Sequence, residues 1–254
     1  MLAYDRHQEI VQLLEIHHSL SVKRLAQQLH VSEPTVRRDL KNMEALGLIR
    51  RTHGGAVSVS NSAYAPLALR SEVESEKKKE IARQAAAMIP EGATVFIDSG
   101  STARYIPQFL QSGQRFTAVC NSLEICRRLT KLRIRTYCVG GLINAPDDAI
   151  RGMHAEQFLR TLHFDYAFFS CTALTDDGAL CGQWEDGVSF LRALLPQAAR
   201  RVFLCSSDKL SKLRPHVVCT LADVDVVLCD VPLPPNLQSM IGKNRRDAAV
   251  SARL

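Results

Sequence analysis

The stretch from residue 32 to residue 55 constrains the fold more than any other part of the sequence. It opens with S-E-P, in which Ser32 can cap the free amides of a helix, and an acidic residue and a proline follow where a first helical turn favours them. Apolar side chains then recur at the spacing of one helical face, which we expect to be buried: Val36, Leu40 and Met43. The stretch therefore predicts an amphipathic helix.

The opposite face of this helix is polar and basic. It carries side chains that can bond base edges or phosphates, namely Thr35, Arg37, Arg38, Lys41 and Asn42. After Gly47, the run L-I-R-R with Arg50 and Arg51, a turn at Gly54 and Gly55, and the β-prone letters A-V-S-V predict a short hairpin. A basic helix followed by a basic hairpin indicates a winged reader of duplex DNA.

Two more helices are expected before this one. Residues 5–17 place Ile10, Leu13 and Leu14 on one helical face, and Ser21 is positioned to cap a second helix that continues to Leu29. Only residues 30–32 separate that helix from the basic one, which is the layout of a helix-turn-helix. The alternative is a small helical bundle that contacts another protein.

Composition bounds the class of protein without identifying it. At 254 residues, with 46% hydrophobic and 23% charged residues, the chain suits two ordered globular domains or one large one. The net charge of +6 decides little, because placement matters more: five basic residues gather in the helix and hairpin. The N-terminus lacks the apolar core of a secretory signal and no run approaches the roughly 20 apolar residues of a membrane span, so we expect a cytoplasmic protein.

Eight cysteines raise the question of metals and disulfides. No C-x-x-C occurs, and four of the cysteines lie within or at the end of apolar, β-like runs: Cys120, Cys138, Cys205 and Cys229. We interpret them as reduced thiols that serve as small buried hydrophobes, with a metal or disulfide framework as the alternative. No cofactor and no metal are therefore expected.

The second part of the chain alternates apolar strands with helices. A polar run of small residues with Pro66 precedes it and reads as a connection, and Lys77 to Lys79 are interpreted as the solvated start of a helix. Strands are expected at 94–98, 116–120, 134–139, 164–170, 201–205 and 224–230, and helices near 102–111, 122–131, 153–161 and 184–199. This pattern predicts a largely parallel sheet covered on both faces.

Ligands of such sheets bind beyond the carboxyl ends of the strands, so the exit loops are the candidate site. In the first, Gly100 allows a tight turn and the amides opening the next helix can hold an anion, although an ordinary strand-to-helix turn has the same pattern. The loops that follow the later strands supply an amide at Asn121, flexible backbone at Gly140 and Gly141, hydroxyls at Ser206 and Ser207, and one cation at Lys209. These groups suit a polyhydroxylated anion. Trp184 is the only tryptophan; Glu185 and Asp186 after it either favour a helix start or lie near the pocket.

A family resemblance follows from these motifs. The run V-S-E-P-T-V-R-R-D-L-K-N-M-E-A-L-G-L-I-R-R-T-H-G-G-A resembles the DNA-binding signature of the DeoR family of bacterial transcriptional regulators. The later I-D-S-G-S-T, N-S, G-G, Asp-Lys and L-C-D resemble the sensor domain of that family, which is similar in fold to ribose-5-phosphate isomerase and the CoA transferases. The resemblance implies a winged helix-turn-helix in front of an α/β sensor domain for a phosphorylated sugar.

The resemblance also assigns roles. It implies effector binding by Asp98, Gly100, Ser101, Thr102, Asn121, Gly141 and Lys209. Thr35, Arg37 and Arg38 are expected to approach bases, and phosphates are expected at Ser32, Lys41, Arg50, Arg51 and His53. Two positions depart from the family pattern: Cys120 stands where Thr is common, and Ser206 where Asp is common. These departures bear on which effector fits.

We accordingly expect a DNA-binding domain at 1–59, a linker at 60–76, an effector-sensing and oligomerisation domain at 77–242 and a tail at 243–254. The expected function is a homo-oligomeric repressor of a carbohydrate or nucleoside catabolic operon, controlled by a phosphorylated sugar or related metabolite. One alternative is an isomerase-like enzyme with an added helical domain, in which Asp98 or Glu185 would supply the carboxylate. Another is a regulator whose second domain serves only for assembly.

Overall fold

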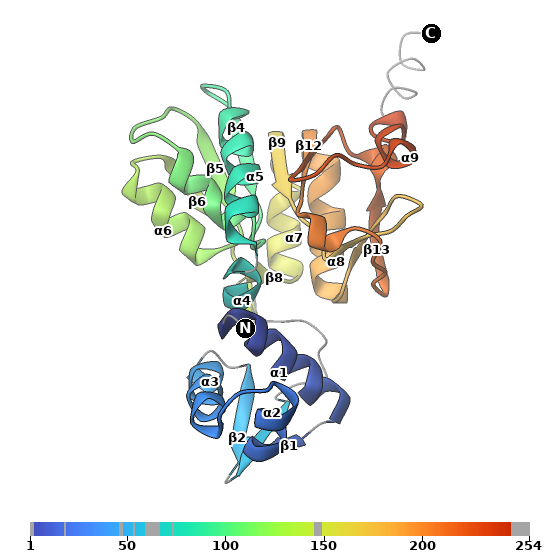
Figure 1. Cartoon of the computed structure of the whole chain (residues 1–254). Helices are drawn as coiled ribbons and strands as arrows, with labels where there is room; N and C mark the ends of the chain where they lie inside the picture. The colour runs from blue at the N-terminus through green and yellow to red at the C-terminus, as the bar shows by residue number, and fades with distance from the viewer. Residues whose placement is uncertain are drawn as a thin grey trace. The chain divides into compact units, whose positions relative to one another are not determined.

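The computed structural model of the chain describes residues 3–17, 19–45, 48–52, 54–58, 67–72, 74–144 and 149–244 (Figure 1). The chain divides into two compact units, Met1–Val73 and Glu74–Leu254, and each is described by itself. Within those described ranges, no helix has the length and apolar character needed to cross a membrane.

The first unit is a winged helix-turn-helix. Its helices are α1 (Ala3–His17), α2 (Val22–Gln28), α3 (Glu33–Ala45) and α4 (Leu67–Glu72), and its strands are β1 (Ser19–Ser21), β2 (Ile49–Thr52) and β3 (Gly55–Ser58). The strands form an antiparallel sheet in the order β1-β3-β2, so the hairpin β2-β3 is the wing. Leu14, Leu25, Leu40 and Ile49 are among the side chains that form its core.

Local signals explain where these helices begin and end. The side chain of Ser21 accepts a hydrogen bond from the amide of Arg24 at 3.3 Å, and that of Ser32 accepts one from the amide of Thr35 at 3.4 Å. Between α2 and α3, His30 has a φ of 51°, in the left-handed region that lets the chain reverse after a helix. The caps were predicted from the sequence; the left-handed histidine was not.

The second unit is built on a six-stranded parallel sheet in the order β14-β12-β9-β4-β5-β6. Its strands are β4 (Thr94–Ile97), β5 (Thr117–Cys120), β6 (Arg135–Cys138), β9 (Phe164–Phe169), β12 (Ala198–Cys205) and β14 (Val226–Cys229). The parallel order places the carboxyl ends of all these strands at one edge, called the carboxyl edge below.

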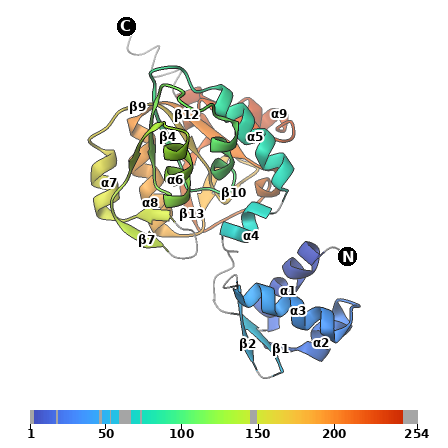
Figure 2. The same ribbon diagram turned by 90° about the vertical axis from the view of Figure 1, so that its left-hand side faces the viewer.

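Helices cover both faces of this sheet (Figure 2). The helix α5 (Ser75–Ala87), the 3-10 helix η1 (Ala103–Phe109) and α6 (Leu123–Lys131) pack on one face, and α7 (Met153–Leu159) and α8 (Glu185–Leu194) pack on the other. Alternate strand residues therefore enter different cores: Val95 and Ile97 face α5, while Phe96 faces the side of α8. Burial on both faces explains why the inner strands β4, β5, β9 and β12 end in apolar, buried runs.

Smaller elements surround the sheet. An antiparallel sheet contains β10 (Ala173–Leu174), β11 (Ala179–Gly182) and β13 (His216–Thr220), and a hairpin contains β7 (Leu142–Asn144) and β8 (Ala149–Arg151). Short helices are η2 (Leu195–Gln197), η3 (Ser207–Lys209), η4 (Leu221–Asp223) and α9 (Pro235–Gln238). The sequence reading predicted neither the antiparallel sheet nor the hairpin.

The expected fold class is confirmed, and the six predicted strands are the six strands of the parallel sheet. Three predictions are wrong in detail. The helix expected at 184–199 ends at Leu194, because Pro196 follows and Ala198 already starts β12; the helix expected at 102–111 is a 3-10 helix that contains Pro107. Lys78, read as part of a solvated helix start, is only 1% exposed.

Candidate functional site

The outer face of α3 is the candidate nucleic-acid surface of the first unit. Val36, Leu40 and Met43 are buried as expected, and this orients the basic side of the helix outward. The predicted contact residues that the structure describes are exposed, or half-buried in the case of Thr35: Ser32, Thr35, Arg37, Arg38, Lys41, Arg50 and Arg51. His53 lies outside the described residues.

The charges on this face differ in how they are held. Arg37 pairs with Glu33 at 3.4 Å, and the backbone amide of Arg51 donates to Glu44 at 2.9 Å, with its guanidinium 3.8 Å from the same carboxylate. Such exposed pairs are weak and exchange readily for another anion. Within the described ranges no acidic side chain pairs with three further cations, which remain open to a polyanion: Arg38, Lys41 and Arg50.

A buried ion pair fixes α3 to α1. Both oxygens of Asp39 accept from Arg6 of α1, at 2.7 Å to Nε and 3.1 Å to the terminal nitrogen, and His7 lies 3.3 Å from the same carboxylate. The side chains of Arg6 and Asp39 are 8% and 3% exposed. The hydrogen bonds that Arg6 donates to Asp39 raise the pKa of Arg6.

The sequence reading missed this residue. Asp39 follows Val36 by three positions and precedes Leu40, so its place on the inward face could have been read from the helical period. Its partner could not, because Arg6 lies 33 residues away.

The wing packs closely against β1. A Cβ added to Gly55 would lie 2.0 Å from the carbonyl oxygen of Leu20, so only glycine fits there. The amide of Val22 donates to the carbonyl of Gly54 at 2.8 Å. These contacts hold the hairpin beside the start of α2.

At the carboxyl edge of the second unit, the exit loops form two adjoining polar clusters. In the first, Asp98 after β4 accepts a hydrogen bond from Asn121 after β5 at 3.1 Å. In the second, the ammonium of Lys209 donates to the hydroxyl of Ser170 after β9 and to the carbonyl of Leu204 at 3.3 Å. Because β9 lies between β12 and β4, the two clusters are neighbours.

Gly100 lies where the clusters meet. A Cβ added there would come within 3.2 Å of the Cβ of Ser170 and 3.7 Å of a carboxylate oxygen of Asp98. The backbone of the first exit loop therefore approaches both clusters closely, as a turn that presents amides to an anion must.

Several buried polar atoms of these loops have no hydrogen-bond partner in the described part of the chain. They are the hydroxyl of Thr102, the amide oxygen of Asn121, the hydroxyl of Ser206 and one oxygen of Asp208. Thr102, Asn121 and Ser206 are fully buried, and Ser101 beside them is 4% exposed. Buried polar groups normally have partners, so this edge has the unmet hydrogen-bonding capacity that a hydroxylated ligand would fill.

The electrostatics of the site centre on Asp98. Burial raises the pKa of Asp98 above its usual value, and the positive charge of Arg151 and the hydrogen bond from Asn121 act in the opposite direction. A carboxyl that resists ionisation is more compatible with a nearby anionic ligand than a fixed negative charge.

Arg151 was not identified from the sequence. It ends β8, its side chain is 15% exposed, and it lies 3.3 Å from Asp186 at the start of α8. The amide of Ile150 donates to the carbonyl of Asn121 at 2.8 Å, which brings β8 against the exit loop of β5. In the sequence, Arg151 is a single arginine at the end of a short apolar run, and such a residue does not by itself predict a neighbour as distant as Asp98.

Gly141 has a supporting position. It has a φ of 153°, and a Cβ there would lie 2.4 Å from the carbonyl oxygen of Arg151. It thus lets the backbone approach β8, and the atoms nearest to such a Cβ belong to Arg151 and Ile150 of β8. Trp184 is 40% exposed, and Glu185 and Asp186 open α8 as the sequence indicated.

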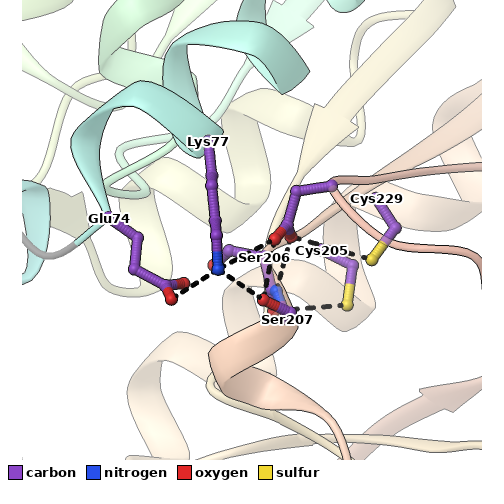
Figure 3. A network of polar contacts seen from close by, with 7 residues as sticks. Glu74, Lys77, Cys205, Ser206, Ser207 and Cys229 are labelled. Atoms are coloured by element: carbon purple, nitrogen blue, oxygen red, sulfur yellow. Dashed lines mark hydrogen bonds and ion pairs between the residues drawn. The ribbon is translucent and has the colours of Figure 1, made fainter.

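A polar network joins the loop after β12 to the start of α5 (Figure 3). The amide and the hydroxyl of Ser207 donate to Asp230 at 2.6 and 2.7 Å. Lys77 points from α5 toward this pair, with its ammonium 3.6 Å from Asp230, and donates to Glu74 at 2.6 Å. The loop that carries Ser206 and Lys209 is therefore tied to the first turn of α5.

The chain matches two family models in sequence. Residues 6–62 match the DeoR-like helix-turn-helix domain, and residues 73–231 match the DeoR C terminal sensor domain. It is 32% identical over 250 residues to the transcriptional repressor AccR of Agrobacterium fabrum, covering 97% of each chain. It is 30% identical over 235 residues to the L-fucose operon activator of Haemophilus influenzae, covering 92% of this chain and 94% of that one.

Among solved structures, the ribose 5-phosphate isomerase A of Methanocaldococcus jannaschii aligns with 55% of this chain and 56% of its own. The TM-score is 0.41 and the sequence identity 16%.

Proposed function

The chain belongs to the DeoR family of DNA-binding transcriptional regulators, and from this premise we propose that it represses a carbohydrate catabolic operon until a phosphorylated sugar binds at its carboxyl edge. Its family makes it a regulator and not an enzyme. The observation that carries the effector site is the set of buried, unpartnered polar atoms in the exit loops that hold Asp98 and Lys209.

On the DNA side, α3 would enter the major groove. Thr35, Arg37 and Arg38 on its outer face would approach base edges. Backbone phosphates would be held by the cap of α3, its next turn and the wing: Ser32, Lys41, Arg50, Arg51 and His53. We further propose a homo-oligomer that presents paired recognition helices to two half-sites, since DNA readers of this type bind paired sites.

On the effector side, the groups divide by chemistry. Lys209 and Arg151 supply positive charge for a phosphate, together with the amides beside Gly100. The unpartnered atoms of Thr102, Asn121 and Ser206 would bond sugar hydroxyls. Ser206 replaces the family's usual acid, so this position would donate to an oxygen as well as accept from a hydroxyl.

The polar contacts in Figure 3 offer a route by which effector binding would change the structure outside the site, at the start of α5. A ligand bound to Ser206 and Lys209 would act on the loop between them. Ser207 in that loop donates two hydrogen bonds to Asp230. Asp230 in turn pairs with Lys77 in the first turn of α5. To change the protein from mostly DNA-bound to mostly free, the effector must prefer the non-binding arrangement by about 5 kcal/mol in the extreme case.

The test is a titration of fluorescent DNA from the gene's own upstream region, followed by anisotropy at two salt concentrations. It is repeated with a panel of sugar phosphates and with the same sugars unphosphorylated. We expect steep salt dependence and loss of binding with one phosphorylated sugar only. Strengthened binding would indicate activation instead, and binding that no ligand changes would contradict the effector site.

Two lysines provide matched variants. Lys209→Met should abolish the ligand response and leave the DNA affinity intact, because Lys209 is buried in the second unit. Lys212→Met removes the same charge from an exposed position on the same loop and should change neither property. An unchanged response in Lys209→Met would remove Lys209 from the site.

A further inference from the structure

Three cysteines meet where α6 packs on the edge of the parallel sheet. Cys120 ends β5 and Cys138 ends β6, and the two residues are direct partners in the ladder. Cys126 lies on α6, which contacts both strands, and it packs in the same core as Cys120. As the ladder partner of Cys120, Cys138 lies on the same face of the sheet. All three are free thiols.

The three thiols differ in access to solvent. Cys120 is buried, Cys126 is half-buried and Cys138 is exposed. The expectation that Cys138 is a buried hydrophobe is wrong, because β6 is the last strand of the sheet and has a neighbour on one side only. An oxidant can thus reach two of the three sulfurs.

The thiols also differ in reactivity. The hydrogen bond from Cys120 lowers the pKa of Cys126 to about 7. The partial desolvation that remains at the exposed Cys138, together with the charge of Cys126, raises the pKa of Cys138 to about 12. Cys126 is therefore largely thiolate slightly above neutral pH, and the thiolate is the form that attacks an oxidant. A reactive thiolate with an accessible thiol on the neighbouring strand is the usual arrangement of an oxidation-sensitive pair.

We propose that Cys126 and Cys138 are a peroxide-sensitive pair. Peroxide oxidises them to a disulfide, which lowers the affinity of the effector site. The Cys126 thiolate attacks one oxygen of hydrogen peroxide, the O–O bond breaks, and the products are a sulfenic acid and hydroxide, which takes up a proton to become water. The Cys138 thiol then attacks the Cys126 sulfur, forms the S–S bond and expels the hydroxyl as a second water. Two thiols are oxidised by two electrons and the peroxide is reduced to two waters.

Cys138 is the partner rather than Cys120 because of its strand. A disulfide brings the two Cβ atoms to about 3.5–4.5 Å, so one of the residues has to shift. Cys120 is held by ladder hydrogen bonds on both sides, to β4 and to β6, and is fully enclosed. Cys138 is paired on one side only, so its strand can move at lower energetic cost.

The disulfide would act on the site through α6. The hydroxyl of Ser122 caps this helix by accepting from the amide of Ile125 at 3.4 Å, and Asn121 immediately before it is bonded to Asp98. Drawing Cys126 toward β6 tilts the helix and strains that contact, so effector affinity falls by about tenfold, within the usual range of coupling between sites. This consequence rests on the proposed function; the disulfide itself does not.

The test uses the full-length reduced protein. It is exposed to a small excess of hydrogen peroxide, quenched with an alkylating reagent and analysed by intact mass and peptide mapping. We expect the loss of two free thiols and a peptide crosslinked through Cys126 and Cys138. Both thiols remaining alkylated, or a crosslink through Cys120, would overturn the proposal.

Variants locate the chemistry. Cys138→Ser should stop at a sulfenic acid on Cys126 that a sulfenic-acid probe traps, and Cys126→Ser should leave Cys138 unoxidised. The matched control is Cys229→Ser, because the thiol of Cys229 is also half-buried and its pKa is also lowered to about 7, by a hydrogen bond from Cys205. Its crosslinking through Cys126 should match that of the unaltered protein, and loss of the crosslink in this variant would contradict the assignment.

The functional arm compares oxidised and reduced protein in the operator titration. If crosslinked protein responds to the effector as the reduced protein does, the disulfide forms but does not change effector affinity, and the coupling between the two is overturned. If no sugar phosphate affects the reduced protein, the proposed function fails independently of the thiol result.

Discussion

The buried pair between Arg6 and Asp39 gives a prediction whose size follows from the structure. Asp39→Ala removes the carboxylate that accepts two hydrogen bonds from Arg6 and leaves a guanidinium whose side chain is 8% exposed. Removing one partner of such a buried pair is destabilising by about 3–5 kcal/mol, because the remaining charge stays buried and loses its bonded carboxylate. A small domain has about 5–10 kcal/mol in total, so the first unit should lose about half of its stability.

The single tryptophan separates the two units in this assay. Trp184 lies in the second unit, so its fluorescence follows unfolding there, while far-ultraviolet circular dichroism reports the helices of both units. In urea, Asp39→Ala should shift the part of the dichroism transition that belongs to the first unit and leave the fluorescence transition in place. The double variant Arg6→Met with Asp39→Leu fills the same space with apolar side chains and should be within about 1–2 kcal/mol of the unaltered protein.

Two results would refute this reasoning. A loss below about 1 kcal/mol in Asp39→Ala would mean that the pair behaves as an exposed one. A double variant as unstable as the sum of the single variants would mean that the two side chains do not interact.

Three further predictions concern single side chains. Arg38→Ala should weaken operator binding by about 1–3 kcal/mol in anisotropy titrations, whereas Arg160→Ala on the exposed end of α7 should not. Asp98→Asn should raise the calorimetric melting temperature at pH 7 but not at pH 4. Burial raises the pKa of Asp98 in the folded protein above 3.8, so folding stability is greatest below that pH and falls as pH rises through the raised pKa. His30→Gly should stabilise the first unit by about 0.5–1 kcal/mol in urea unfolding and His30→Val should destabilise it, because φ is 51°.

The architecture was predictable because its signals are local. The caps at Ser21 and Ser32, the apolar spacing in α3 and the doubly buried strands each depend on residues close in sequence. The predictions failed where a nearby proline or a distant contact decides the outcome. Pro196 ends α8 early, and Lys78 is enclosed by the fold although its sequence neighbours are charged.

The candidate site was predictable in part for a similar reason. Parallel strands bring their exit loops to one edge, so Asp98, Asn121 and Lys209 could be placed there from sequence alone. Arg151 could not, because it reaches this edge on a separate hairpin, and the position of Cys138 beside Cys120 depends on the register of β6 beside β5. Both are contacts between segments that the sequence pattern does not join.

The most direct test of the account is a reciprocal binding measurement. The affinity of the sugar phosphate found in the operator titration is measured by Trp184 fluorescence, with the protein alone and with saturating operator DNA. If the effector at the carboxyl edge controls DNA binding, operator must weaken effector affinity by the same factor by which effector weakens operator affinity. Equal effector affinity with and without operator would contradict the coupling on which the account rests.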